Sequence, residues 1–560
     1  MSKKLRTVLA VVMALILVIP GSFSEAKEAV VQENTAETDA VPDTADELTD
    51  GQKNENSDAE ESPKSDSSQK DNGSSDGKTM EENIKTQGEP LKRTENMTAE
   101  VKQQKENVYS DGTLLYTVSD DENGEKTATV SGISKKAKNV SEIIVPDFLI
   151  FEEADIPVIA VADEAFAGTE IERISLPDST GSIGACAFLD CSKLMEFTIP
   201  LYCDSIGDAA FLNCKSLQYV NFVDTGCRKL GDIAFAECGL TEVIFGDWIE
   251  SVGACCFSQC EKLESVKLGQ NCSSIGAAAF TGCTSLVKIT KPKANRQLII
   301  KNGCIYNADG TVLLSGWLAE GDVVINKKVK EIAPFSFEAN SRITSVSIAG
   351  SVKKLPEGCF ENCKKLKTVT LKKGVKSIGE NCFYSCPALK KIEIASTVKS
   401  IAGNPFMQCG KLAKFSVNSN NKYFKARNGM LVTKNGKKII AAPGVKGDIV
   451  IYKAARSIND CAFAYNSKIT SLTLHENINK LGESAFFGCS SLKYVSIANR
   501  DMKLVNSEMT ENGKDIAGVF RGCAENLEIS VPFSVDSGKR KSIESSLKCH
   551  TDDGVIIVQY

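Results

Sequence analysis

Histidine is scarce in this sequence of 560 residues, which contains only His475 and His550. A Ser-His-Asp or Cys-His catalytic set requires a histidine beside its nucleophile, and we interpret both histidines as surface residues. The sequence also lacks the P-loop pattern G-x-x-x-x-G-K-[ST], the nucleophile elbow G-x-S-x-G and the zinc motif H-E-x-x-H. We therefore expect a protein that is not an enzyme and has no cofactor and no metal site.

Long hydrophobic runs are also scarce. The one clear apolar run, Val8–Ile19, is shorter than the ~20 residues that a membrane-spanning helix needs. It follows a short basic region and precedes the small-x-small sequence Ser24–Glu25–Ala26, an arrangement typical of a secretory signal. We predict a signal peptide at residues 1–26, a secreted or cell-surface location, and no transmembrane span in the mature chain.

Aromatic residues are absent from residues 27–106, which carry 21 acidic and 10 basic side chains. Such a segment cannot bury enough apolar surface to offset the entropy lost on ordering. We predict that it is an acidic, disordered linker or stalk. The remaining residues, 107–560, have a net charge of about +3, so we expect no nucleic-acid partner.

One phrase, I-G-x-x-A-F-x-x-C-x-x-L-x-x-V-x-L, recurs along the rest of the chain, for example as IGDAAFLNCKSLQYVNF and IGENCFYSCPALKKIEI. Most copies follow one another after 22 to 24 residues. A fixed period of this length predicts a repeat solenoid, in which each copy forms one coil of about 23 residues. The phenylalanine that marks each copy is Phe166, Phe188, Phe211, Phe235, Phe257, Phe280, Phe337, Phe360, Phe383, Phe406, Phe463, Phe486 or Phe520.

Each coil is expected to contain two short parallel strands. Apolar residues nine and eleven positions after the marker alternate with polar ones, which predicts a strand with one buried face. An earlier apolar pair, such as Val375 and Ile378, predicts a second strand before the marker. We expect about one helical turn around the marker, between the two strands.

The repeated phrase resembles the leucine-rich repeat of the BspA-like bacterial surface proteins, over about residues 107–560. Members of that family are typically exported, displayed on cells and credited with adhesion to host or microbial surfaces. The resemblance implies a non-catalytic protein that binds other macromolecules through an extended solenoid surface. The implied partner is an extracellular protein, such as a host-matrix or cell-surface component. A glycan is the alternative partner.

The resemblance extends to the ends of the fold and to two long steps of 57 residues between markers. We expect a β-rich N-terminal cap at 107–160, the solenoid at 161–530 and a strand-helix-strand cap at 531–560. The two long steps contain hairpin-like inserts, GCIYNADGTVLLSGW and GMLVTKNGKKIIAAPG, and similar inserts recur in the family. Asp309–Gly310 and Asn435–Gly436 are typical of the tight turns of such hairpins.

Cysteine is abundant, with 21 residues. Thr169, Asn340 and Asn466 replace it at one repeated position, which indicates an inward, small, polar side chain that serves the turn backbone. We expect a mostly reduced structural ladder. The alternatives are a few disulfides, for which Cys255, Cys256 and Cys260 form the local cluster, and a metal site. The ladder position, three residues after the marker, holds Cys191, Cys214, Cys238, Cys260, Cys283, Cys363, Cys386, Cys409, Cys489 and Cys523.

Side chains eight and ten positions after the marker must face away from the core, and solenoids often bind partners on such a face. The copy after Phe235 is one residue short, which places Glu242 and Ile244 there. Trp248 and Trp317 are expected to pack, and a surface strand that binds nothing remains the alternative at each position. The binding candidates on this face are Tyr219, Asn221, Lys267, Lys288, Thr368, Thr370, Lys391, Glu393 and Tyr494.

Overall fold

The structure is a computed structural model. The predicted signal peptide, most of the predicted linker and the expected helix of the C-terminal cap lie outside the residues that it describes. No helix long and apolar enough to cross a membrane occurs in the described part of the chain. The described residues are 91, 93–94, 96–137, 139–151, 154–499, 503–504, 518–531 and 556–559.

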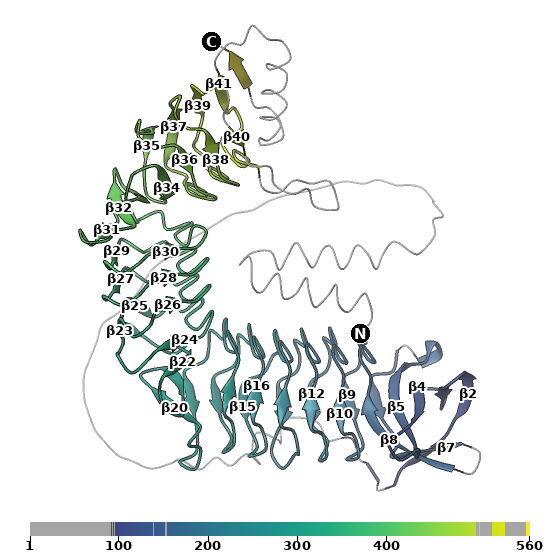
Figure 1. The fold of residues 1–560 in the computed structure, drawn as a ribbon. Helices are drawn as coiled ribbons and strands as arrows, with labels where there is room; N and C mark the ends of the chain where they lie inside the picture. The colour runs from purple at the N-terminus through teal and green to yellow at the C-terminus, as the bar shows by residue number, and fades with distance from the viewer. Residues whose placement is uncertain are drawn as a thin grey trace, which may run out of the picture. The chain divides into compact units, whose positions relative to one another are not determined.

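An N-terminal β cap, drawn in blue and purple in Figure 1, precedes the solenoid. The first two strands lie inside the range that we expected to be disordered, because β1 pairs with β7 and Val101 is buried beside them. The ordered cap therefore begins before residue 107. Its strands are β1 (Thr98–Glu100), β2 (Lys102–Lys105), β3 (Val108–Ser110), β4 (Leu114–Asp120), β5 (Lys126–Ile133), β6 (Glu142–Ile144), β7 (Phe148–Phe151) and β8 (Ala154–Val161).

The first row of solenoid strands lies before the markers and continues the sheet of the cap, since β8 pairs with β10 in parallel. Equivalent residues stack in register, as Ile183 does on Ile206. The row comprises β10 (Ser182–Ile183), β12 (Ser205–Ile206), β14 (Lys229–Leu230), β16 (Ser251–Val252), β18 (Ser274–Ile275), β24 (Glu331–Ile332), β26 (Lys354–Leu355), β28 (Ser377–Ile378), β30 (Ser400–Ile401), β36 (Ser457–Ile458), β38 (Lys480–Leu481) and β40 (Lys503–Leu504).

The second row of strands lies after the markers and confirms the predicted alternation. In β11, Phe197 is buried between the more accessible Glu196 and Thr198. The short copy keeps its face, because Glu242 pairs with Ser265. The row comprises β9 (Arg173–Ser175), β11 (Glu196–Thr198), β13 (Tyr219–Asn221), β15 (Glu242–Ile244), β17 (Ser265–Lys267), β19 (Lys288–Thr290), β25 (Ile343–Ile348), β27 (Thr368–Leu371), β29 (Lys391–Ile394), β31 (Ser416–Val417), β37 (Ile469–Leu474), β39 (Tyr494–Ile497) and β41 (Glu528–Val531).

The predicted helical turn around each marker is wrong. Cys186 and Asp190, on either side of Phe188, have left-handed φ angles of 54° and 59°, which an α-helix cannot contain. The N–H groups of Cys186, Phe188 and Asp190 donate to carbonyls of the next coil at 2.7–2.9 Å. The intervening N–H groups close turns within their own coil. Among the described residues the one helical segment is a 3₁₀ turn, η1 (Lys135–Ala137), in the cap.

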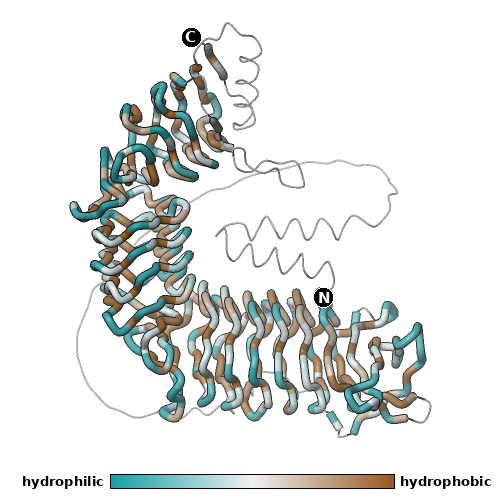
Figure 2. Tube along the Cα trace, viewed as in Figure 1, coloured by the Kyte–Doolittle hydropathy of each residue, from teal (hydrophilic) through white to brown (hydrophobic). Residues whose placement is uncertain are grey.

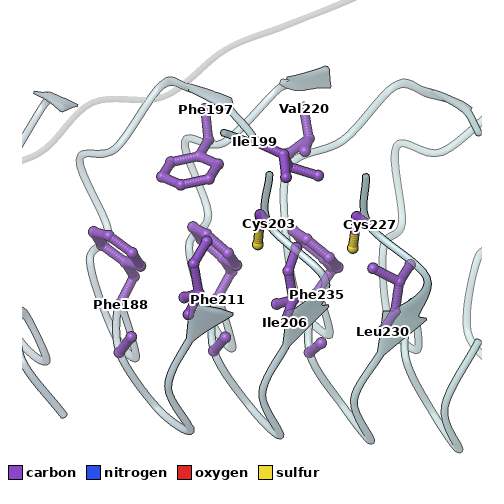
Figure 3. Close-up of a cluster of buried hydrophobic side chains, with 14 of the residues drawn as sticks. Phe188, Phe197, Ile199, Cys203, Ile206, Phe211, Val220, Cys227, Leu230 and Phe235 are labelled. Carbon is purple, nitrogen blue, oxygen red and sulfur yellow. The ribbon is translucent and has the colours of Figure 1, made fainter. Parts of the chain in front are cut away.

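The marker phenylalanines stack on one another along the core, as Figure 3 shows for Phe188, Phe211 and Phe235. Ring centroids of successive members of this trio lie 4.9 and 5.0 Å apart, with interplanar angles of 7° and 4°. Phe197 meets the ring of Phe211 edge-on at 4.7 Å. Figure 2 shows that hydrophobic and hydrophilic residues alternate along the tube in the coils of the solenoid.

Both inserts contain the predicted hairpin, and Gly310 and Gly436 adopt φ angles of 67° and 74° in the two turns. Each hairpin is preceded by a further antiparallel strand. The first insert comprises β20 (Leu298–Lys301), β21 (Cys304–Asn307), β22 (Val312–Ser315) and β23 (Gly321–Ile325). The second comprises β32 (Phe424–Arg427), β33 (Met430–Thr433), β34 (Lys438–Ala441) and β35 (Gly447–Val450).

Each insert is itself a coil of the stack. Leu313 of β22 pairs with Ile332 in the first row, and Val323 of β23 pairs with Val346 in the second. The insert also separates two cores, because Ile305 joins the cluster before it and the adjacent Cys304 joins the cluster after it. At the C-terminal end, β41 pairs in parallel with β42 (Ile556–Gln559).

Candidate functional site

The sheet face is the solvent side of the second row of strands and of the insert strands β23 and β35, which pair with β25 and β37. In the coils with a marker it consists of the residues eight and ten positions after that marker. All nine candidates lie on strands of this row. Five of them are half-buried and four are exposed. Tyr219 and Asn221 lie on β13, Lys267 on β17, Lys288 on β19, Thr368 and Thr370 on β27, Lys391 and Glu393 on β29, and Tyr494 on β39.

Four of the candidates form one group on neighbouring strands β27 and β29. Thr368 pairs with Lys391, and Thr370 pairs with Glu393. The Lys391 ammonium lies 2.7 Å from Glu393 Oε1, and Thr370 Oγ1 donates to Glu393 Oε2 at 3.2 Å. These contacts hold the pKa of Glu393 below its usual value. The group thus presents hydrogen-bonding side chains that are already ordered before a partner arrives.

The other candidates are separate from that group. Tyr494 is 58% exposed and lies between Ser471 and Glu528 of the neighbouring strands. Tyr219 is only half-exposed, and burial together with the nearby Glu196 carboxylate raises its pKa. Asn221 accepts a hydrogen bond from the Val223 N–H at 3.0 Å, so it is partly engaged in its own turn.

Two acidic residues of the sheet face were missed in the sequence. Asp322 accepts hydrogen bonds from Thr344 and Ser345 at 3.0 and 2.6 Å. Asp448 accepts equivalent bonds from the next coil in the second insert. The repeated sequences GDVVI and GDIVI are the signal that would have revealed them. Val324 and Val450, two residues later, are 68% and 69% exposed.

The two tryptophans differ in their surroundings. Trp317 is buried as expected, and its indole N–H donates to the Cys283 carbonyl at 3.3 Å. Trp248, which we expected to pack, is 53% exposed. The Arg228 guanidinium lies 5.5 Å from its ring centroid, which leaves much of the indole open to solvent.

The ladder cysteines all make the same contact. Each thiol donates to the main-chain carbonyl of the marker phenylalanine one coil earlier, as Cys214 does to Phe188 at 3.1 Å. Burial raises the pKa of thiols such as those of Cys191 and Cys489 to about 12, which makes them poor nucleophiles. The Sγ–O distances range from 3.0 to 3.4 Å. All 20 described cysteines are free thiols.

Asparagine replaces cysteine in the ladder only after an insert. The coils of Asn340 and Asn466 each follow a hairpin coil, which has no marker phenylalanine. The Asn340 amide donates to the carbonyls of Gly316 and Ala319 at 2.8 and 2.9 Å. Its longer reach and second donor satisfy the differently placed carbonyls of the insert.

The one described histidine is held by the main chain. Both ring nitrogens of His475 are hydrogen-bonded, one to the Tyr452 carbonyl and the other to the Asn477 N–H. His550 lies outside the described residues. Over the ranges that the structure describes, no group of three or more His, Cys, Asp or Glu side chains could hold a metal ion.

Comparison with known proteins identifies the family. A family model described as BspA type leucine rich repeat region (6 copies) matches residues 159–238, 223–310, 321–428 and 447–548, which is more than half of the chain. The chain therefore belongs to the BspA-type leucine-rich repeat family, as the recurring phrase predicted. No curated protein sequence matches this chain.

Several solved structures of bacterial proteins resemble this chain. A leucine rich cell surface protein of Faecalibacterium prausnitzii A2-165 is 21% identical, with 72% of this chain and 97% of that chain covered and a TM-score of 0.44. The pneumococcal vaccine antigen PcpA is 16% identical, with 83% of this chain and 99% of that chain covered and a TM-score of 0.44. A leucine-rich repeat protein of Bacteroides ovatus ATCC 8483 is 20% identical, with 70% of this chain and 98% of that chain covered and a TM-score of 0.38. Identities this low concern the fold alone.

Proposed function

We propose that this protein is exported, is displayed at a cell surface and binds another macromolecule through its sheet face without catalysing a reaction. The partner is an extracellular protein, such as a host-matrix or cell-surface component. The observation that carries the proposal is the face formed by β23, β25, β27, β29 and β31, which pair in parallel in this order. These strands present polar side chains to solvent in register over neighbouring coils.

The chemistry of the face suits a protein partner. The ordered Thr370–Glu393–Lys391 group offers a hydroxyl, a carboxylate and an ammonium at fixed positions. The phenol of Tyr494 is an exposed aromatic anchor of the kind that contributes strongly to protein interfaces. The family comprises bacterial surface proteins, and the N-terminal sequence at 1–26 has the features of a secretory signal, which together support the proposed location.

A binding screen of the purified full chain against arrays of extracellular proteins and glycans tests the proposal. We expect a saturable protein ligand whose affinity falls at least tenfold, or about 1.4 kcal/mol, when Tyr494→Ala and Lys391→Ala are combined. Tyr202→Ala is the matched control, because Tyr202 is 68% exposed but lies off the sheet face. Equal loss in the control would show that the sheet face is not the binding site.

The same screen separates the alternatives. Glycan ligands without any protein ligand would replace the proposed partner class by the alternative one. Loss of binding on shortening the hairpin turns at Asp309–Gly310 or Asn435–Gly436, with the sheet face intact, would move specificity to the inserts. Absence of binding to both the protein and the glycan arrays would contradict a binding function and favour a structural surface protein.

A further inference from the structure

Charge is segregated along the first row of strands. We define the edge as the six residues of each coil that end at the buried aliphatic residue of this row. In the six segments from 178 to 313 these residues include five acidic and two basic ones, and in the six segments from 327 to 458 they include 13 basic residues and one acidic residue. The acidic edge comprises 178–183, 201–206, 225–230, 247–252, 270–275 and 308–313; the basic edge comprises 327–332, 350–355, 373–378, 396–401, 434–439 and 453–458.

The lysines of the basic edge stack in register. The Lys376 N–H donates to the Lys353 carbonyl, and the Lys399 N–H to the Lys376 carbonyl, both at 2.8 Å. Strands β26, β28 and β30 pair in parallel at the adjacent residues. Successive lysines are therefore one strand spacing apart, about 4.8 Å. After the second insert the row resumes, where the Arg456 N–H donates to the Lys437 carbonyl at 2.7 Å.

On the acidic edge, charges at the repeat position equivalent to Lys376 compensate one another. Asp204, Arg228 and Glu250 occupy it in three successive coils and alternate in sign. Arg228 lies 3.5 Å from each carboxylate. Alternation of this kind gives every charge a neighbour of opposite sign within the protein.

The basic edge has much less compensation, although the Asp309 carboxylate of the preceding coil lies near Lys328. Among the described residues, none of its 13 basic side chains forms an ion pair. Lys353 donates to the Gly350 carbonyl, and Lys376 and Lys399 are exposed to solvent. Like charges directly opposite on paired strands destabilise a sheet. The row therefore costs folding stability that a ligand of opposite charge would restore.

We propose that the basic edge binds a linear acidic polysaccharide, whose sulfate or carboxylate groups lie along the row of lysines. A row of evenly spaced ammonium groups matches a chain with regularly repeated anions. The six segments contain no aromatic residue on which the bases of a single-stranded nucleic acid would stack. They also present no apolar anchor for a membrane, because their aliphatic residues, such as Val375 and Ile378, are buried.

This inference does not rest on the proposed function of the sheet face, which belongs to the second row of strands. It also changes what the composition implied. A net charge of about +3 over residues 107–560 indicated little attraction for polyanions. The average conceals two edges of opposite sign, and a polyanion responds to the local field of one of them.

Affinity for heparin, a sulfated polysaccharide, tests the inference with the full chain at about 0.15 M salt, where the Debye length is about 8 Å. We expect saturable binding that weakens as salt is raised. Combining Lys353→Glu, Lys376→Glu and Lys399→Glu should weaken it at least tenfold. Arginine at the same three positions should preserve it within about twofold, because the charge remains. Both variants should keep the wild-type melting temperature within a few degrees, since all three side chains are exposed.

A matched control reverses three lysines of the sheet face, Lys267, Lys288 and Lys391, to glutamate. It should leave heparin binding unchanged while it alters binding of any protein ligand. Hyaluronate carries carboxylates but no sulfates, so comparing its affinity with that of heparin tells whether the row binds carboxylates or needs sulfates. Absence of heparin binding, equal loss in the control, or equally tight binding to duplex DNA or anionic vesicles would overturn the inference.

Discussion

The thiol of Cys386 lies 3.1 Å from the main-chain oxygen of Phe360, one coil earlier in the stack. The same contact recurs at Cys409, whose thiol donates to Phe383 at 3.0 Å. Each ladder thiol therefore satisfies the carbonyl beside a buried aromatic ring. A cysteine at this position links neighbouring coils through a hydrogen bond and needs no disulfide to do so.

Removal of one ladder thiol should destabilise the fold, because the buried Phe360 carbonyl would keep only the long 3.4 Å hydrogen bond from the Cys363 N–H. Cys386→Ala is expected to lower the free energy of unfolding by about 1–3 kcal/mol, measured by urea denaturation. Cys382→Ala is the matched control, because Cys382 is equally buried and no described carbonyl accepts from its thiol. Equal losses in the two variants would show that packing alone accounts for the effect.

Loss of one marker ring should be more costly. Phe383 is fully buried between Phe360 and Phe406, with ring centroids 5.5 and 5.8 Å away. Phe383→Ala should lower the free energy of unfolding by about 3–5 kcal/mol, while Tyr494→Ala at the surface should change it by less than about 0.5 kcal/mol. An unaltered melting curve for Phe383→Ala would contradict the assigned repeat register.

Two buried carboxyl groups should make stability depend on pH. Burial raises the pKa of Glu338 and of Glu361 from 4.5 to about 8. Between these values the folded state holds protons that the unfolded state has released, so stability falls as pH rises from about 5 to about 8. Replacing both residues by glutamine should therefore raise the urea midpoint at pH 8 and do so less at pH 5. Glu357→Gln, at an exposed site, should show no such difference.

The thiols should resist alkylation in the native protein. Burial holds the pKa of thiols such as Cys359 at about 12, so little thiolate exists at pH 8. With Cys549, which lies outside the described residues, changed to serine, we expect mass spectrometry to find little iodoacetamide label before unfolding. After unfolding in guanidinium without a reductant, all 20 remaining cysteines should be labelled. A shortfall of two would indicate a disulfide.

The stacking of the coils could be predicted from the sequence, because the period and the buried positions depend on hydrophobic spacing alone. Phe188 and Phe197 fall at positions whose burial the alternation requires. The turn could not be predicted, because the left-handed conformation of Cys186 is imposed by hydrogen bonds to the next coil. Those bonds connect residues more than 20 positions apart and leave no local signal.

The candidate site was predicted only in part. Strand alternation was enough to place Lys391 and Glu393 on the solvent side, but their ion pair depends on rotamers that a pattern does not contain. Tyr219 is half-buried, a degree of burial that the alternation of the strand does not specify. The basic edge was missed because net charge averages over positions that the fold keeps apart. Only the register that brings Lys353 beside Lys376 reveals it.

Each insert replaces one coil and leaves the stack unbroken, and this has an evolutionary consequence. Phe463 follows Phe337 by the same number of residues as Phe406 follows Phe280, and Gly447 follows Gly321 by that number too. Recombination between such similar gene segments would add or delete whole coils and keep the register of the stack. The descendants of this gene can therefore lengthen or shorten their surface in single inherited steps, whereas a comparable deletion in a globular domain would destroy its core.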